Sequence, residues 1–525
     1  SLDLQGGDLY VGYIHSQYPD PVGGVGVLAL HGGRIDAGRL FAGSKLAHAD
    51  TSRVAIHGGR LEVEDLSRIG WNQGRCQYVQ TGGTFHTDEL EFWNTVVDLR
   101  GGLIESNGFY IDETASVIQT GGRWEATHSA GGGSNQATVT EGATYRIEAG
   151  ELAVGQWVVS GEIGQVGGAV EAHSIDVYDR YDYHGGQLDA NHIGVYRDGV
   201  FDHPTGAIRG ASVTVGSRYS GRGYYNLHGD GLLEGGNYVV TQSSVFTLAD
   251  SATLSGEGLE ISRQGLFRQT GGVSSLDAIG IDRQSGVCRL EGGRMTAGEL
   301  EVGLWDEGTF EQLGGDMTVT GPVTLGGDDR SSAYGEVRLV DGRFTAGIER
   351  IGGEGEGLFD QQGGVHTVGA LEIRPRGTLR IAGGATYVIG CRMLAEGTID
   401  FAGSEARLEF TGRTLADLHT PIASGESASL RVGPNAILLY RPGNDPAAQV
   451  GQFVAEGIVH EVGAPLTVPA GGSYGGCGTI PDRVIVHGEL AAPVGGALDL
   501  EDGIEVSPGA VSLRPRATSW SMKVA

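Results

Sequence analysis

Polar and apolar residues alternate along most of the chain, and each short alternating stretch ends at a pair of glycines. Before the pair at Gly292, for example, the apolar positions are Cys288 and Leu290. After it, Leu300 and Val302 continue the alternation. A period of two is typical of β-strands and not of helices. Each copy of this pattern therefore predicts two or three short strands, separated by corners at which glycine allows the backbone to turn.

The glycine pair recurs at short, nearly constant intervals. Gly82, Gly101 and Gly121 are 19 and 20 residues apart, and later copies are 21 and 22 residues apart. One copy cannot bury its apolar face alone, whereas stacked copies bury a continuous core. The sequence therefore predicts an all-β fold, a parallel β-helix (β-solenoid) with about 20–23 residues per coil and right-handed coiling. About twenty coils spaced ~4.8 Å apart would form a rod on the order of 100 Å long.

The regularity of the repeat predicts four parts of the chain. Residues 1–410 carry the regular Gly-Gly repeat, which is already running at the first residue and so predicts an uncapped end. Residues 411–470 contain clustered prolines and few glycine pairs, which predicts either irregular coils or an excursion from the solenoid. A second style of repeat occupies 471–513, and 514–525 form a tail outside any repeat.

A glutamine replaces the apolar residue two positions before the glycine pair in six copies. These glutamines are Gln80, Gln119, Gln165, Gln269, Gln312 and Gln361. They form either an internal ladder, in which each amide bonds to its neighbour one coil away, or a row of ligand-binding amides. Leucine or isoleucine holds the same place in other copies, as at Leu30 and Ile56. This exchange favours the internal ladder.

The composition disfavours some classes of binding partner. The formal net charge is −29, which opposes binding to nucleic acids and to anionic membranes. No stretch approaches the roughly 20 apolar residues of a membrane span, so no membrane insertion is expected. Cys288 stands where other copies have phenylalanine, which predicts a small buried hydrophobe. The four cysteines have no zinc-ligand spacing, and their redox state is left open.

The densest cluster of polar residues lies within 175–186. It contains Asp176, Asp179, Arg180, Asp182 and His184. Oxygen ligands in such a row can hold calcium, the one cofactor that the sequence suggests. The alternation, however, places Val177, Tyr181 and Tyr183 on the opposite face. A solvent-facing strand with an internal Asp–Arg pair is the favoured interpretation, and no catalytic, cofactor-binding or metal-binding residue is assigned.

Three further groups of residues each allow a functional and a structural interpretation. Residues 217–230 contain Arg218, Arg222, Tyr224 and Tyr225, either a sugar-stacking patch or a loop. Asp328 and Asp329 form an acidic pair in a stretch with turn composition, which favours a solvated corner. Histidines stand at or near the place before the turn at His31, His57, His184 and His228. The first two fall in consecutive copies, so a stacked pair is one interpretation, and exposed corner residues are the favoured one.

Residues 468–513 resemble the repeats of autotransporter passengers and related bacterial surface proteins. The matching residues are Gly476, Gly478, Thr479, Ile480, Val484, Val486, Gly488, Leu490 and Pro493. The rest of the chain resembles the glycine-rich β-solenoid repeats of large secreted proteins. The resemblance implies the fold and an extracellular or cell-surface location, and it implies no activity.

The sequence therefore predicts a non-enzymatic, secreted structural or surface protein. It would be a rigid rod acting as a fibre subunit, a coat or an adhesin stalk, and its partners would be other copies joined head to tail and cell-surface glycans. An uncapped solenoid end offers unpaired strand edges to another chain. The alternative is a carbohydrate-active β-helix, either a polysaccharide lyase or a glycan-binding module like those of phage tailspikes.

Overall fold

The structure is a computed structural model of the 525-residue chain. It describes residues 8–11, 26–43, 51–70, 75–126, 136–217, 221–327, 333–403, 405–423, 425–493 and 496–508. These residues form an all-β parallel β-solenoid of about 20 turns with about 21 residues per turn. The predicted fold class and coil length are therefore confirmed, whereas right-handed coiling stays a prediction. The tail at 514–525 lies outside the described residues.

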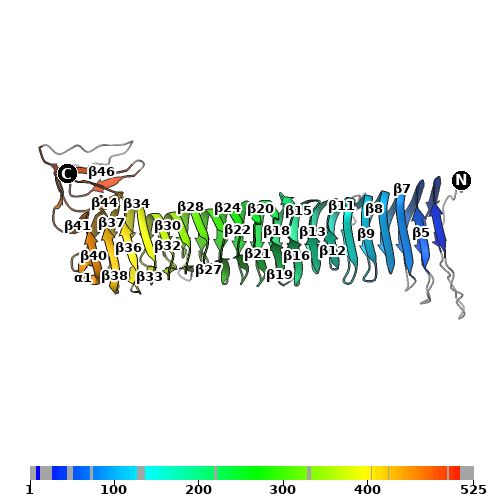
Figure 1. Ribbon diagram of the computed structural model, residues 1–525, viewed down its shortest axis with the longest axis horizontal. Coiled ribbons are helices and arrows are strands. Elements are labelled where there is room, and N and C mark those ends of the chain that lie inside the picture. The colour runs from blue at the N-terminus through cyan, green and yellow to red at the C-terminus, as the bar shows by residue number, and fades with distance from the viewer. Residues whose placement is uncertain are drawn as a thin grey trace. The chain divides into compact units, whose positions relative to one another are not determined.

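The chain divides into two compact units, unit 1 (1–257) and unit 2 (258–525). In each unit the strands of successive coils lie side by side (Figure 1). The strands of unit 1 are β1 (Asp8–Val11), β2 (Val27–Leu30), β3 (Arg34–Ala37), β4 (Arg39–Ala42), β5 (Ser52–Ile56), β6 (Arg60–Ile69), β7 (Cys76–Phe92), β8 (Thr95–Ile111), β9 (Ser116–Ala126), β10 (Gln136–Val139), β11 (Thr144–Val159), β12 (Glu162–Gln165), β13 (Ala169–Val177), β14 (Arg180–Tyr183), β15 (Gln187–Val195), β16 (Gly199–His203), β17 (Ala207–Arg209), β18 (Ser212–Val215), β19 (Gly223–Leu227), β20 (Leu232–Val240) and β21 (Val245–Leu248).

The chain passes from unit 1 to unit 2 within β22 (Thr253–Ile261). The further elements of unit 2 are β23 (Leu266–Gln269), β24 (Val273–Ile281), β25 (Gly286–Leu290), β26 (Arg294–Val302), β27 (Glu307–Gln312), β28 (Asp316–Leu325), β29 (Tyr334–Leu339), β30 (Arg343–Ile351), β31 (Glu356–Gln361), β32 (Val365–Ile373), β33 (Gly377–Ile381), β34 (Ala385–Ala395), β35 (Thr398–Phe401), β36 (Arg407–Phe410), β37 (Leu415–Leu418), β38 (Gly425–Val432), β39 (Ile437–Tyr440), α1 (Pro446–Gln449), β40 (Val450–Ala455), β41 (Ile458–Glu461), β42 (Leu466–Val468), β43 (Ser473–Gly475), β44 (Gly478–Ile480), β45 (Val484–Val486), β46 (Glu489–Ala491), β47 (Leu498–Leu500) and β48 (Ile504–Val506).

Strands pair in parallel with the strand at the corresponding place one coil on. β26 pairs with β24 and with β28, which aligns Ile279, Leu300 and Val323 in one inward-facing column. All three side chains are buried. Because successive side chains of a strand point to opposite faces, the alternation in the sequence becomes a buried face and a solvent-exposed face. The column continues through β30 and β32 with Glu349 and Leu371.

Large aromatic side chains fill the core of unit 1. Phe201, Tyr225 and Phe246 come from three successive coils and stack with ring centroids 4.9 and 4.7 Å apart. None of the three is exposed to solvent. Burial of rings this large contributes much of the hydrophobic stabilisation of a domain. The inward position of Tyr225 also makes the predicted sugar-stacking role wrong for this residue.

The two glycines of a pair are needed for different reasons. A Cβ at Gly292 would lie 2.7 Å from the carbonyl oxygen of Thr270 on the preceding coil, so the first position is closed by backbone. Gly293 has φ +80°, a conformation that residues with a Cβ rarely adopt. The pair is thus a corner at which successive coils approach more closely than side chains allow.

The glutamines before the pair bond to the backbone and not to one another. Nε2 of Gln269 donates to the carbonyl oxygen of Gly272 at 3.3 Å and, one coil on, to that of Arg294 at 3.0 Å. The same two contacts are made at their own corners by Gln80, Gln119, Gln312 and Gln361. The expected ladder of amides is therefore wrong. The corner presents two buried carbonyl groups that one NH₂ group satisfies together.

Other side chains fill the glutamine position in two coils of unit 1. The hydroxyl of Tyr183 donates toward the carbonyl oxygens of Gly186 at 2.9 Å and Ala207 at 3.3 Å. Nε2 of His203 lies 3.1 Å from the carbonyl oxygen of Gly206 and donates to it. In these coils a tyrosine or a histidine thus supplies the buried hydrogen-bond donor that glutamine supplies elsewhere, whereas other coils have leucine or isoleucine at this position.

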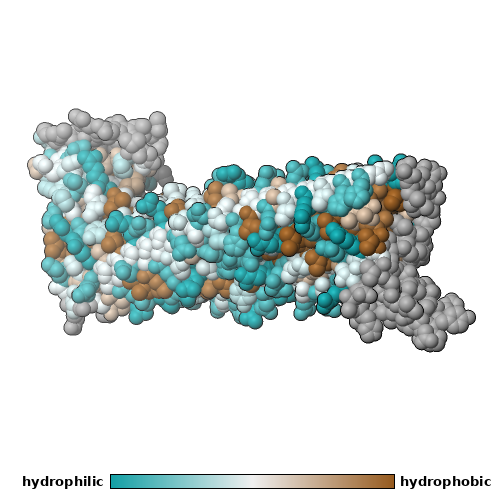
Figure 2. All heavy atoms as spheres, turned by 45° about the vertical axis from the view of Figure 1, so that its right-hand side comes forward, coloured by the Kyte–Doolittle hydropathy of each residue, from teal (hydrophilic) through white to brown (hydrophobic). Residues whose placement is uncertain are grey.

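The exposed face carries many ion pairs between neighbouring coils. Arg268 pairs with Glu291 at 2.8 Å and Arg289 with Glu311 at 2.7 Å. Exposed pairs of this kind contribute little individually, about 0–1 kcal/mol each. Hydrophilic residues cover much of the face seen in Figure 2, with separate apolar areas among them. Val27 and Val96 of unit 1 are 65% and 53% exposed.

Candidate functional site

The last strands of unit 2 form a small second stack, the C-terminal module (466–506). β45 pairs in parallel with β42 and β48, β43 with β46, and β44 with β47. The module packs against the coils formed by β34 to β41. Leu415, Ile437 and Leu439 of those coils share one hydrophobic cluster with residues of the module, among them Leu466 and Val484.

In the strands that the module covers, apolar residues no longer alternate with polar ones. The outward-facing column that starts at Glu372 continues with Leu394, Asp417 and Leu439. In β39, three consecutive residues are fully buried, because the module covers the face that is solvated in earlier coils. Continuous apolar runs are typical of strands covered on both faces. The stretch assigned from sequence to irregular coils, 411–470, thus contains strands that continue the parallel ladders.

A disulfide and a close backbone contact fasten the module to the coils. Cys391 and Cys477 are joined with their Cα atoms 5.0 Å apart, and the amide of Cys477 donates to the carbonyl oxygen of Cys391 at 2.7 Å. A Cβ at Gly476 would lie 2.3 Å from the backbone nitrogen of Leu415. Gly476 therefore lets the module approach β37 closely, and the disulfide holds the module in that place.

A pocket of about 290 Å³ lies between the coils and the module. The coils supply Arg392, Met393, Leu394, Glu396, Leu415, Asp417, His419 and Arg441, and the module supplies Cys477, Gly478, Thr479, Pro481 and Glu501. Every one of these residues belongs to unit 2. The pocket exists only while the module is docked, because the module forms its second wall with Cys477, β44 and the residues near them.

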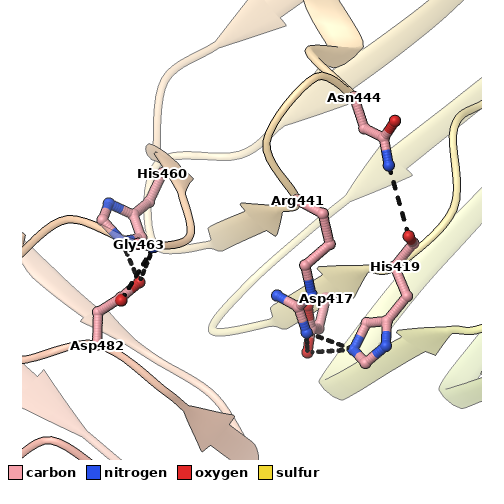
Figure 3. A network of polar contacts seen from close by, with 7 residues as sticks. All are labelled: Asp417, His419, Arg441, Asn444, His460, Gly463 and Asp482. Atoms are coloured by element: carbon pink, nitrogen blue, oxygen red, sulfur yellow. Dashed lines mark hydrogen bonds and ion pairs between the residues drawn. The ribbon is translucent and has the colours of Figure 1, made fainter.

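Asp417, His419 and Arg441 converge on the coil side of the pocket (Figure 3). Oδ2 of Asp417 lies 2.9 Å from Nε2 of His419 and 3.1 Å from Nη2 of Arg441. Nη2 of Arg441 is also 2.6 Å from Nε2 of His419. Nε2 can donate to the carboxylate or accept from the guanidinium, but not both. The three groups thus engage one another, which occupies the nitrogen that a general base would need.

A second polar group crosses from the last coil to the module. Asp482 of the module lies 2.9 Å from Nε2 of His460 and accepts from the amide of Gly463 at 3.0 Å (Figure 3). The side chains of His460 and Asp482 are only 10% and 14% exposed. Buried polar groups are kept when their partners are in place, so this contact fixes how the module sits. The contacts of Asp482 with His460 and Gly463 thus link the module to the last coil of unit 2.

The residues predicted from the cluster at 175–186 do not converge on one point. Tyr181 and Tyr183 face inward and are fully buried, as the alternation predicted. Arg180 pairs with Asp182 at 2.8 Å on the outer face, which confirms the internal Asp–Arg pair. Asp179 lies at the exposed corner before them. No group of three or more histidine, cysteine, aspartate or glutamate side chains in the described part of the chain is arranged to hold a metal ion.

The predicted histidines have separate surroundings. His31 and His57 are exposed corner residues, as favoured from the sequence, and their rings also stack with centroids 4.8 Å apart. His228 lies 3.3 Å from Asp202, and His184 is exposed. Arg222 pairs with Asp198 at 3.5 Å. Arg218, Asp328 and Asp329 lie outside the described residues.

Two of the four cysteines are free, and the other two form the disulfide. Cys76 and Cys288 are free and buried, and the hydrophobe predicted at Cys288 is confirmed by an exposure of 0%. Burial raises the pKa of Cys76 to about 12 and also raises that of Cys288. The disulfide and the Asp417 network were not predicted from the sequence. The loss of alternation in Ile-Leu-Leu-Tyr at 437–440 was the available signal.

Within the described residues, no helix is both long enough and apolar enough to cross a membrane. Compared with protein-family models, curated proteins and solved structures, the chain matches none of them. The likeness to autotransporter passengers therefore remains an expectation from sequence.

Proposed function

We propose that the chain is a non-enzymatic structural or surface protein whose solenoid coils associate end to end with those of other copies. The observation that carries this proposal is the half-covered last coil of unit 2. Among the described residues, β40 pairs with β38 and β41 pairs with β39, each on one side. Phe453 and Val459 are only half-buried, whereas their partners one coil earlier, Leu430 and Leu438, are fully buried.

The first strands of unit 1 have the complementary property. β1 pairs with β4 one coil on, and no second partner of β1 occurs among the described residues. A second copy that adds its β1 coil to the β40 coil would extend the same parallel ladder and cover inward residues of the last coil. Contact between two different surfaces of one chain is heterologous and generates an open filament or a ring.

The disulfide supports a location outside the cytoplasm. Structural disulfides form and persist in oxidising compartments, and Cys391–Cys477 joins two parts of the chain 86 residues apart. We therefore keep the extracellular or cell-surface location as part of the proposal. Calcium and cell-surface glycans stay predictions from the sequence.

The test is the assembly state of the purified chain, measured by sedimentation and electron microscopy over a range of concentrations. Phe453→Lys places a charge where the added coil would bury it, so it should leave single particles only. Val454→Lys is the matched control, because Val454 belongs to the outward column of Arg431 on the same strand. Single particles of the unaltered chain at every concentration would refute end-to-end association, as would filaments of the Phe453→Lys variant.

A further inference from the structure

We propose that one outward face of unit 1 is a binding site for an uncharged polysaccharide. The site consists of two aromatic pairs, Trp93 with Tyr110 and Tyr178 with Tyr196, which we call the aromatic row. The inference goes beyond end-to-end association and is independent of it, because the row lies on the side of the coils and not at a strand edge.

The aromatic row lies on two neighbouring outward-facing columns of the parallel sheet, with Tyr110 in one column and Trp93, Tyr178 and Tyr196 two residues further along their strands in the other. Tyr110 aligns with Thr138, Thr138 with Val158, Val158 with Asp176, and Asp176 with Gly194. Tyr178 and Tyr196 follow the ends of the strands that contain Asp176 and Gly194. The two pairs are thus separated by three coils, or roughly 14 Å at ~4.8 Å per coil. A ligand that contacts both pairs must be an extended chain running across the strands.

The sequence holds the ring of Tyr196 against the sheet. A Cβ at Gly194 would lie 2.3 Å from Oη and 2.4 Å from Cε2 and Cζ of Tyr196. The ring therefore occupies the space that a side chain at position 194 would take, and its other face points away from the sheet. The ring of Tyr178 is 5.6 Å away and inclined by 43°. Glycine at position 194 therefore makes room for the Tyr196 ring on the surface of the sheet.

The two pairs share the same construction. The guanidinium of Arg197 lies 5.4 Å from the ring centroid of Tyr178, and that of Arg68 lies 6.0 Å from that of Trp93. The rings of Trp93 and Tyr110 are 5.7 Å apart. An aromatic pair with an arginine over one ring thus occurs twice on the same outward face of unit 1. Cation–π contacts already take up one face of each of these rings, so the remaining surface suits an uncharged ligand.

Polar side chains lie beside the rings. Asp176 accepts from Nε2 of Gln156 at 2.8 Å, and Nε2 of His192 lies 3.5 Å from Oη of Tyr196. Burial raises the pKa of Tyr196 to about 12 and lowers that of His192, so both are uncharged near pH 7. Beside the first pair, Nε1 of Trp93 donates to Glu91 at 2.8 Å.

This combination matches the surface of a sugar. Sugar rings present C–H groups on their faces, which pack on aromatic rings, and hydroxyl groups at their edges, which bond to carboxylates, imidazoles and phenols. The formal charge of −29 disfavours anionic polymers. The observations therefore favour uncharged glucans, mannans or galactans over polyuronates.

The test is affinity electrophoresis of the full chain in gels that contain soluble glucans, mannans or galactans, with a polyuronate gel in parallel. At least one uncharged polymer should retard the protein. Tyr196→Ala and Trp93→Ala should each weaken binding about tenfold, the equivalent of about 1.4 kcal/mol, and the double variant more than either. Tyr224→Ala is the matched control, because Tyr224 is a half-exposed tyrosine of unit 1 that lies in a different column, between Val200 and Val245.

The outcomes separate this inference from the proposed function. Retardation by no uncharged polymer would overturn it, as would equal effects of Tyr196→Ala and Tyr224→Ala. Sedimentation of the same variants should show unchanged assembly, because neither ring lies at a strand edge. Failure of assembly with intact binding would refute only the proposed function.

Discussion

Oε2 of Glu349 lies 2.9 Å from Nε2 of His366, and both side chains are fully buried in the core of unit 2. They come from adjacent coils, in columns otherwise filled by residues such as Val323 and Phe344. The ring of His366 also stacks on Phe359 at 4.2 Å. Neither side chain has a partner with hydrogen-bond geometry among the described residues. The pair thus interrupts a core that apolar side chains could fill.

Removal of one member of this pair should cost far more than removal of both. Glu349→Leu alone should lower the free energy of unfolding by about 3 kcal/mol, because it leaves a buried imidazole without its carboxylate. Glu349→Leu with His366→Phe should restore or exceed the original stability, since the columns already accept leucine and phenylalanine. Urea unfolding of the two single variants and the double variant measures the coupling. A double variant less stable than either single variant would contradict the prediction.

The glycine pairs can be tested by comparing Gly292 with Gly280. Gly292→Ala should destabilise unit 2 by about 1–3 kcal/mol, because the added Cβ meets the carbonyl oxygen of Thr270. Gly280 lies within β24, and a Cβ there has nothing within 4 Å. Gly280→Ala should therefore be neutral or stabilise by about 0.5 kcal/mol. Similar losses of unfolding free energy in both variants would show that the corner places no special demand on glycine.

The fold was predictable from the sequence because one rule repeats in every coil. The two-residue period gives the buried face of a strand such as β24, and Gly292 with Gly293 gives the corner. The partners of a buried amide were harder to predict, because the period places Gln269 inside the coil without saying that two carbonyl groups lie there. The inward position of the glutamine was therefore predicted correctly, but the amide ladder deduced from it was wrong.

The candidate site was less predictable for a different reason. Cys391 and Cys477 are 86 residues apart, and no local period relates the module to the coils it covers. The aromatic row combines residues such as Trp93 and Tyr196 that are unremarkable one coil at a time. They form a surface only through the register between strands. The glycine pairs indicate this register approximately, because insertions of a few residues shift it.

The structural role of the glutamines predicts a difference between Gln165 and Gln187. Nε2 of Gln165 donates to the backbone carbonyl of Gln187 at 2.9 Å, and its Oε1 accepts from Tyr181 at 2.7 Å. Gln165→Leu should cost about 1–3 kcal/mol, because two buried polar groups lose their partner. Gln187→Leu changes an exposed side chain and keeps the acceptor carbonyl, so it should be nearly neutral. Thermal unfolding of unit 1 in both variants distinguishes these outcomes.

The cysteines predict a specific pattern of alkylation. At pH 8 in the folded chain, iodoacetamide should modify none of the four, because burial keeps Cys76 and Cys288 as neutral, inaccessible thiols. After mild reduction, Cys391 and Cys477 alone should react. Mass spectrometry of tryptic peptides identifies the modified residues, and guanidinium-unfolded protein is the positive control. Label on Cys288 in the folded chain would contradict the buried position.

The histidine in the glutamine position predicts that unit 1 loses stability in acid. Burial lowers the pKa of His203 to about 4, whereas the unfolded chain takes up this proton near 6.5. Between these values the unfolded state binds more protons than the folded state, so stability is complete above pH 6.5 and falls as the pH approaches 4. The loss should reach about 3 kcal/mol at the lower value.

His203→Gln isolates this effect, because five other corners place a glutamine amide where Nε2 of His203 lies. The variant keeps a donor for the carbonyl oxygen of Gly206, which accepts at 3.1 Å in the unaltered chain, and it has no group that titrates. We expect equal stability of the two proteins at pH 7.5 and a growing advantage of the variant below pH 6. His228→Gln serves as the control, since this histidine is partly exposed beside Asp202. Urea unfolding at several pH values gives both curves, and parallel curves for His203→Gln and the unaltered chain would show that His203 is not the origin of acid sensitivity.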